Sequence, residues 1–533
     1  MLEDRRKRIS RYYFELAEKC PDWFAERIRA VNYLKGHPFL EQQPESLGES
    51  ELLRTINPHE IYLFEVYGPE KFDKLERGAE KLFSESNLFL AEIDRYSKFF
   101  DELYRPTWGR WKEIGSIFSP EASPTISRPK AFRDLPEMVN RVDVSVHQVL
   151  PSLAVVLGRV ILSEKIKDKI KEIITSEYRE QAELSSLKPW QVHKSSIKFL
   201  GPNQQRKDKF ENLLDELQKG VESILKNNFS SGYFLSSVNN STKYPKCPSY
   251  RVFLAKPYEP VIRILAASNY RDKHRQILEC FSVGPMDALF SGVYIGQNSI
   301  FIKDPATVWR EDERKFPIRT IIGLPELLTE KDILNNNPQF SSLYRIHELI
   351  KYHIYYFSLD SLLTQLSSEV ADNRKSAFAE AGLEKNFEDL TRVNQEVARS
   401  EILLESLEED LANHKESITH YLEDLPVKLK SLKGNNSTSP YLLDHLEKRI
   451  ERQIELIKTQ SSLATRSIEN EVALKNIEVN YQLQRRVVWL SIGLLFLAAL
   501  QAYNLISWHD LASIFMKIPY YWSKAIPGVL NFF

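Results

Sequence analysis

The sequence predicts an N-terminal α/β or α+β region, then long helices, and finally C-terminal transmembrane helices. Three observations predict this fold class. Strand-like and helix-like segments alternate over residues 1–330, helical patterns without strands follow, and residues 487–506 contain no charged side chain. About 20 apolar residues at 1.5 Å rise are needed to cross the hydrocarbon core of a bilayer. We therefore expect a membrane protein with a large soluble region.

The composition is that of a largely soluble chain. Its 533 residues include 72 Lys and Arg against 73 Asp and Glu, and the mean hydropathy is -0.37. This balance argues against a general nucleic-acid surface, so we expect no direct nucleic-acid binding. The 3 cysteines are too few for a disulfide framework or a metal knuckle, and they indicate a reducing compartment. The basic N-terminus is not followed by an apolar segment, so it is not a secretory signal.

Residues 1–330 are expected to form one or two α/β domains. The first 35 residues predict a basic amphipathic helix, which either packs on the domain or lies on an anionic membrane. The run IYLFEVYG beginning at Ile61 predicts a strand. The segments that follow predict two helices and a loop rich in Pro, Ser and Trp, at 70–83, 88–104 and 105–135.

Further strand and helix signals complete this region. Residues 142–162 mix alternation with a β-branched run, and they predict strands of a buried sheet despite Pro151. Two charged segments predict helices at 163–186 and 204–227. A second strand-rich zone extends from Tyr250 to about Leu324. This alternation predicts the α/β class.

Long helices dominate after residue 330. Residues 331–425 predict two long antiparallel helices, at 341–370 and 383–425, and residues 426–440 predict a polar linker. From Tyr441 no Pro or Gly occurs until Gly493. One helix of about 65 residues, roughly 100 Å long, is therefore expected to run through a stalk at 441–486 into the apolar run at 487–506.

The predicted stalk carries an apolar stripe with an eleven-residue period. Such a repeat gives about 3.67 residues per turn, so the stripe follows a nearly straight path. Either copies of this helix pack against one another, or the stripe packs against the helices at 331–425 of the same chain. The stripe residues are Leu446, Ile450, Ile457, Ile468, Val472, Val479 and Leu483, with Ser461 in register.

Charge predicts the orientation of the first span. Arg485 and Arg486 directly precede it, and positive charge favours the cytoplasmic side of a membrane. We therefore expect an inner (cytoplasmic) membrane protein with the bulk of the chain in the cytosol.

Polar residues inside the first span are candidate functional residues. Ser491 and Gln501 lie on one helical face, and Asn504 follows one turn later. Because polar groups are costly to expose to lipid, such residues face partner helices or water. Either they line a pore with Asn504 at its mouth, or they form hydrogen bonds between helices. Residues 509–533 predict a second transmembrane segment or an interfacial one.

Signatures of enzymatic chemistry are missing from the sequence. It contains no Gly-rich phosphate loop, no HExxH and no GxSxG motif. His147, His193 and His274 are isolated, which is typical of structural histidines. We therefore predict no enzyme, no catalytic residue, no metal ligand and no identified cofactor, and the sequence does not identify ligand-binding residues.

The order of segments over about 340–533 resembles the CorA-like divalent-cation channels. Two long helices, a stalk helix continuous with the first span and a second apolar segment carry the resemblance. In that family the first span ends with Gly-Met-Asn, whereas here it reads Ala502-Tyr503-Asn504, so only the Asn matches. The end of the stalk, with Asn470, Asn476 and Asn480, is also similar to the Asn-bearing end of a CorA stalk.

The resemblance implies a homo-oligomer, a pentamer if CorA-like, that works in the lipid bilayer. Divergent CorA-like proteins with enlarged heads are membrane effectors of prokaryotic antiviral systems, including some beside type III CRISPR loci. It therefore implies a pore or effector gated through the cytosolic domain, with a nucleotide second messenger or a divalent cation as ligand. A magnesium transporter and a membrane-tethered coiled-coil scaffold remain alternatives.

Overall fold

The computed structural model divides into two compact units, each described by itself. The first, which we call the head, comprises Met1–Glu369 and Ser400–Lys458, and the second, the helical unit, comprises Val370–Arg399 and Thr459–Phe533. The predicted helix at 1–35 lies outside the described residues. The structure describes residues 56–105, 109–125, 127–178, 181–184, 197–237, 247–255, 289–293, 299–303, 318–324, 342–378, 387–423, 430–431 and 441–505.

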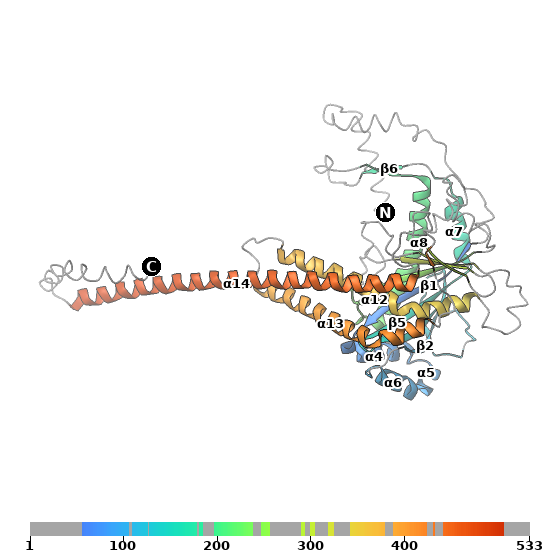
Figure 1. Cartoon of the computed structure of the whole chain (residues 1–533), viewed down its shortest axis with the longest axis horizontal. Helices are drawn as coiled ribbons and strands as arrows, with labels where there is room; N and C mark the ends of the chain where they lie inside the picture. The colour runs from blue at the N-terminus through green and yellow to red at the C-terminus, as the bar shows by residue number, and fades with distance from the viewer. Residues whose placement is uncertain are drawn as a thin grey trace, which may run out of the picture. The chain divides into compact units, whose positions relative to one another are not determined.

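A mixed ten-stranded sheet forms the centre of the described head (Figure 1). The strand order is β12-β9-β10-β11-β8-β1-β5-β4-β2-β3. The pairs β8–β11 and β2–β3 are parallel, and the other described pairs of this sheet are antiparallel. The strands are β1 (Ile56–Tyr67), β2 (Arg110–Phe118), β3 (Lys130–Phe132), β4 (Val139–Leu150), β5 (Leu153–Leu162), β8 (Ser249–Ala255), β9 (Leu289–Val293), β10 (Ser299–Lys303), β11 (Ile318–Leu324) and β12 (Lys430–Ser431).

The hairpin β4–β5 confirms the buried strands predicted at 142–162. Its β-branched residues are buried on both faces, which explains why the sequence shows an almost continuous apolar run. Pro151 does not interrupt the sheet because it lies in the turn between the two strands. Outside this sheet, β6 (Gln181–Leu184) pairs with β7 (Ile197–Leu200).

The loop predicted at 105–135 is wrong, because β2 and β3 lie within it. Strand β2 starts with Arg110, Lys112 and Glu113 among its first residues, so the alternation expected of a half-buried strand is hidden. Its second half is fully buried. Strand β3 has only three residues and ends the sheet, so its sequence signal is weak.

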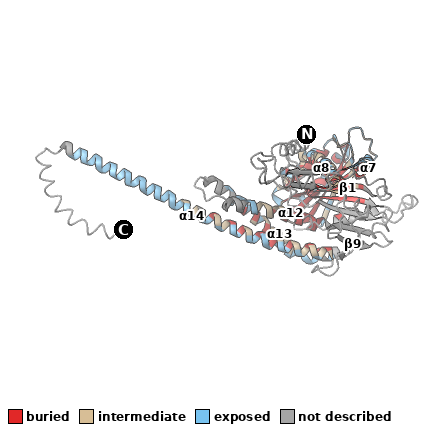
Figure 2. Cartoon of the chain, turned by 90° about the horizontal axis from the view of Figure 1, so that it is seen from above, coloured by how far each residue is buried: buried red, intermediate tan, exposed pale blue. Residues whose placement is uncertain are grey.

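Two helices cover opposite faces of β8. Phe253 packs against Phe210 of α8 (Pro202–Phe229), with ring centroids 5.8 Å apart. Three positions earlier on the same strand, Tyr250 packs against Phe357 of α12 (Ser342–Phe378) at 4.3 Å. Side chains of opposite parity along a strand point to opposite faces. The centre of the sheet is therefore buried on both sides (Figure 2).

Shorter helices connect the strands of the head (Figure 1). The helix predicted at 70–83 is formed by the 3-10 turn η3 (Pro69–Lys71) and α4 (Phe72–Phe83). The helix predicted at 88–104 is broken at Glu92 into α5 (Asn87–Ala91) and α6 (Ile93–Glu102). The helix predicted at 163–186 is α7 (Lys165–Thr175), which buries an isoleucine at every fourth position and ends before β6. A second 3-10 turn, η5 (Leu235–Ser237), follows α8.

Three long helices complete the described chain: α12, α13 (Phe387–Glu423) and α14 (Leu442–Leu505). Helix α14 is continuous over 64 residues, which confirms the single helix predicted from Tyr441. The short strand β12 lies inside the segment predicted as a linker at 426–440. The structure thus has a mixed sheet, helices on both of its faces and one long apolar C-terminal helix.

Polar contacts fix the start of α14 within the head. Arg449 Nε lies 2.8 Å from the buried Asp360 carboxylate of α12, and Gln453 donates a hydrogen bond of 3.1 Å to Thr364. Lys415 of α13 pairs with Glu447 at 2.8 Å. The first turns of α14 are therefore held by α12 and α13 of the same chain.

Candidate functional site

The C-terminal part of α14 is the most unusual surface of the described chain. Every residue from Asn476 to Ala502 is exposed (Figure 2). Within α14, the most apolar window of 18 residues has a mean hydropathy of 1.5, and none of it is buried. By length and composition, α14 is the one described helix that can cross a membrane. An exposed apolar surface of this extent marks a contact with lipid or protein.

The predicted pore residues lie on this exposed helix. Ser491 and Gln501 are exposed, and Arg485 and Arg486 are exposed just before the apolar run. Asn504 belongs to the last turn of α14, although its side chain lies outside the described set, as does the whole segment 509–533. A single helix cannot enclose a pore, so the pore-lining role stays a prediction.

The eleven-residue stripe divides into two parts. Leu446, Ile450 and Ile457 are buried in the head. In the helical unit, Ile468 is buried with Val397 of α13 and Ala464, and Val472 packs against this cluster as a partly buried residue. Own-chain helices thus cover the stripe up to Val472, as one of the two sequence interpretations expects.

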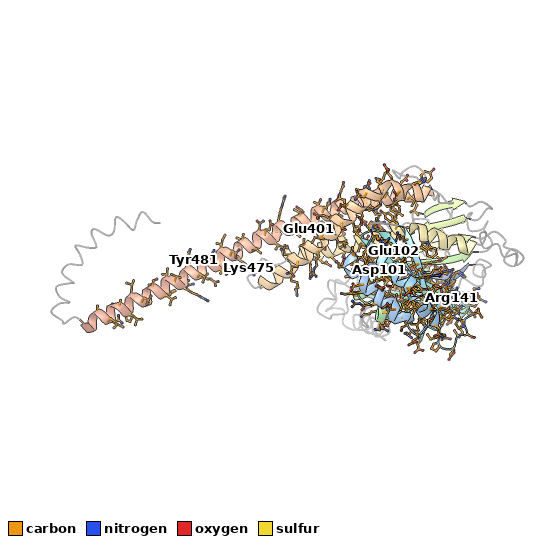
Figure 3. All side chains as sticks on the ribbon, turned by 90° about the horizontal axis from the view of Figure 1, so that it is seen from below. Asp101, Glu102, Arg141, Glu401, Lys475 and Tyr481 are labelled. Atoms are coloured by element: carbon orange, nitrogen blue, oxygen red, sulfur yellow. The ribbon has the colours of Figure 1, made fainter. Side chains whose placement is uncertain are left out.

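Beyond Val472 the stripe is open. Val479 is 53% exposed and Leu483 is 51% exposed. Further apolar side chains of α14, such as Leu474, Ile477 and Tyr481, are more exposed still, and Figure 3 shows Tyr481 and Lys475 on this part of the helix. The second part of the stripe is therefore exposed on this chain, and its packing against another copy stays a prediction.

The head buries the carboxyl group of Glu65 on β1, where backbone N–H groups surround it. Its Oε1 accepts hydrogen bonds from the backbone N–H of Val66 at 2.7 Å and of Phe234 at 2.8 Å, and its Oε2 accepts one from Leu235. Burial raises the pKa of Glu65 to about 8, although the three backbone hydrogen bonds act to lower it. This carboxyl holds the turn after α8 against β1, and near neutral pH it is largely protonated.

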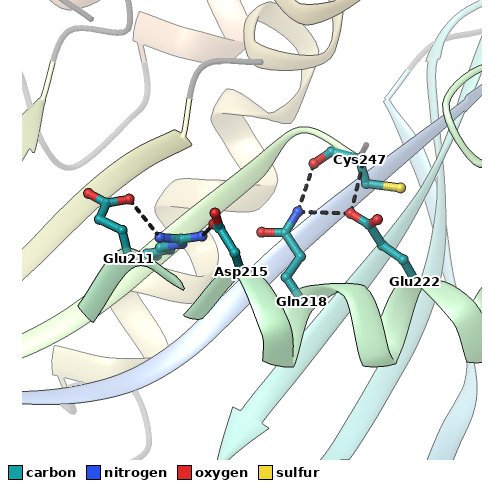
Figure 4. A network of polar contacts seen from close by, with 6 residues as sticks. Glu211, Asp215, Gln218, Glu222 and Cys247 are labelled. Atoms are coloured by element: carbon teal, nitrogen blue, oxygen red, sulfur yellow. Dashed lines mark hydrogen bonds and ion pairs between the residues drawn. The ribbon is translucent and has the colours of Figure 1, made fainter. Parts of the chain in front are cut away.

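A second buried network lies between α8 and β8 (Figure 4). Arg251 of β8 contacts Glu211 at 3.1 Å and also Asp215, both on α8. One and two turns further along α8, Gln218 and Glu222 bond to the backbone of Cys247, with Gln218 donating to its carbonyl at 2.8 Å. These charges are paired and hydrogen-bonded inside the fold, so we assign them a structural role.

A small cavity opens beside β2, where the sequence predicted only a loop. It has a volume of about 310 Å³ and is lined in part by Tyr96 of α6 and by Trp111, which is 48% exposed. Sequence reasoning missed this site because β2 was not recognised as a strand. The available signal was a tryptophan between charged residues, because a large aromatic side chain in a polar segment is unusual unless it is buried or contacts a ligand or partner.

Searches for similar proteins do not assign the chain to a family. No protein-family model, no curated protein and no solved structure matches it. Among the described residues, no group of three or more His, Cys, Asp and Glu side chains is arranged to hold a metal ion. His147 is buried and bonded to Ser145 at 2.9 Å, whereas His193 and His274 lie outside the described residues.

Proposed function

We propose that the chain is a homo-oligomeric membrane protein in which copies of α14 cross the bilayer and form a pore controlled by the cytosolic head. One observation carries the proposal. The helix that is packed among α12 and α13 at its start becomes fully exposed and uncharged over its last turns without any break. A helix with this change of surroundings connects a folded domain to lipid.

Two features support assembly of several copies. The open part of the stripe offers apolar side chains at the same spacing as its buried part, so another α14 is a suitable neighbour. In addition, Ser491 and Gln501 add polar groups to the span, and these are stabilised by partner helices or by water. A ring of α14 helices satisfies both requirements. The CorA-like order of segments agrees with such a ring, and a pentamer is then expected.

The proposed orientation places the head in the cytosol and α14 in the inner membrane. Arg485 and Arg486 support it, because Lys and Arg beside a span remain on the cytoplasmic side. A nucleotide second messenger or a divalent cation is the proposed ligand of the head, by the same CorA resemblance, and an antiviral membrane effector is the proposed role. Ligand binding then changes how the head holds the start of α14.

Reconstitution of the purified full chain into vesicles tests the proposal. The wild type should release an entrapped small dye or ion once the ligand is added, and light scattering in detergent should give an oligomer. Asn504→Leu should alter the release, because it removes a polar group from the pore mouth. Ile492→Leu is the control, since at 3.6 residues per turn Ile492 lies about 120° from Asn504 and about 180° from Gln501 around the helix axis, and the change keeps its size.

The outcomes separate this proposal from its alternatives. A strictly monomeric protein in detergent contradicts the pore. Metal uptake that restores growth of a magnesium-transport-deficient strain indicates a transporter instead. If an unrelated transmembrane helix can replace residues 487–533 without loss of function, the span is only an anchor and the chain acts as a scaffold.

A further inference from the structure

The cavity beside β2 is built by an irregularity in the sheet. The register between β2 and β4 shifts between Glu113 and Gly115, as in a β-bulge. Bulges redirect side chains and occur often beside functional sites. Trp111, Lys112, Glu113 and Gly115 all line the cavity as a result of this local geometry, although successive strand residues normally alternate between faces.

Gly115 brings a second segment close to the bulge. A Cβ at this position would lie 2.6 Å from both the Phe83 ring and the Pro129 carbonyl oxygen, so only glycine permits this approach. The adjacent Ser116 N–H donates a hydrogen bond of 2.8 Å to the same carbonyl. The segment before β3 is therefore fixed against β2, and this places Arg128 next to Glu113.

Trp111 provides an aromatic platform at the cavity. One side of its ring stacks on the buried His147, with centroids 6.1 Å apart and an interplanar angle of 16°. His147 is itself held by a hydrogen bond with Ser145, so the stacked imidazole fixes the orientation of the indole. Trp111 is 48% exposed, so part of its indole faces the cavity, and Leu88, which is 42% exposed, adds apolar surface there.

Charged groups at the cavity offer a donor beside an acceptor. Arg128 and Glu113 form an ion pair of 2.8 Å, and both side chains are only partly buried. A guanidinium has five N–H donors and a carboxylate has two acceptor oxygens, so the pair keeps further groups for a ligand. Lys112 lies 4.9 Å above the Tyr96 ring, which leaves these two side chains occupied with each other.

We propose that this cavity, the Trp111 pocket, binds a planar heteroaromatic ring that has an amide edge. The ring stacks on Trp111, Glu113 accepts a hydrogen bond from the ring N–H, and Arg128 donates one to the neighbouring C=O. A volume of about 310 Å³ is at the lower end of ligand pockets and suits a single or fused ring. This inference does not rest on the membrane role, because the pocket lies entirely in the head.

Equilibrium dialysis of the full chain in detergent with tritiated hypoxanthine tests the pocket. Hypoxanthine has the amide edge, whereas purine has the same ring system without the carbonyl. We expect hypoxanthine to bind saturably. Purine should compete with it only weakly, with an affinity about tenfold lower. Trp111→Leu keeps an apolar side chain but removes the stacking surface, so it should weaken hypoxanthine binding about tenfold.

Two further variants complete the test. Arg128→Leu should also weaken hypoxanthine binding, through a different contact. Two variants with the same effect make a folding defect in one of them an insufficient explanation. Leu90→Ala changes an exposed apolar residue of α5 that does not line the cavity, and it should bind as the wild type does. The proposal is overturned if the wild type shows no saturable binding or if Trp111→Leu binds normally. Equal competition by purine would overturn the amide-edge assignment.

Discussion

Replacing Glu65 by Gln should remove a pH-dependent loss of stability from the head. The folded carboxyl keeps its proton up to a pH of about 8, whereas its ordinary pKa is 4.5. The folded state therefore binds the proton more tightly than the unfolded state, so stability is greatest at low pH and falls as the pH rises from about 4.5 to about 8. The slope approaches about 1.4 kcal/mol per pH unit in this window.

Between pH 6 and pH 8 the wild-type head should lose about 2 kcal/mol of stability from this group. Urea unfolding of the full chain in detergent, followed by tryptophan fluorescence, measures the free energy of unfolding at each pH. Glu65→Gln cannot ionise, so the loss should disappear. The absolute stability should fall, because the amide nitrogen replaces one oxygen that accepts a backbone hydrogen bond. The change with pH, and not the level, is therefore the decisive quantity.

Glu70→Gln serves as the control, because Glu70 is an exposed glutamate in the same part of the chain. It should keep the wild-type dependence on pH. If Glu65→Gln loses as much stability between pH 6 and pH 8 as the wild type does, the buried carboxyl is not the source of the effect. The reasoning from burial would then be refuted.

Three further substitutions test the packing of the head by thermal or urea unfolding. Gly115→Ala should lower the free energy of unfolding by about 1–3 kcal/mol, because the new Cβ overlaps its neighbours. Gly158→Ala should be tolerated, because the nearest contact of its Cβ would be 3.4 Å away. Equal effects of the two substitutions would contradict the overlap. Ile457→Ala should lower the free energy of unfolding by about 3 kcal/mol, because Ile457 is fully buried in the head. A near-zero change would show that the start of α14 is not packed as described. Asp410→Ala should lower the free energy of unfolding by about 1–3 kcal/mol, because it removes the carboxylate that accepts a hydrogen bond of 2.7 Å from the Ser152 N–H. Asp410→Asn keeps an acceptor oxygen, so it should lower the stability much less.

The parts of the fold that were predictable have strong local patterns. Helix α14 was recognised because no Pro or Gly interrupts the first fifty residues from Tyr441, and helix continuity depends on such local properties. The hairpin β4–β5 was recognised because strands buried on both faces show continuous β-branched runs. Both signals lie within a single segment of sequence.

The parts that were missed depend on contacts between distant segments. The pairing of Arg251 with Glu211 joins residues separated by 40 positions, and no spacing rule connects them. The Trp111 pocket requires β2, α6 and the segment before β3 to converge. The eleven-residue stripe of α14 showed correctly where an apolar surface lies. Its burial up to Val472 depends on packing against α13, a separate segment of the chain, so the stripe alone did not show where burial ends.

The two ends of the described sheet have a consequence for crowding. The order of strands ends with β3, which has three residues, and with β12, which has two. A long open edge offers a row of backbone donors and acceptors onto which another sheet can add. These two terminal strands themselves therefore offer neighbouring molecules little backbone to hydrogen-bond. When heads are held at high density on a surface, these short terminal strands disfavour the addition of another sheet at either end.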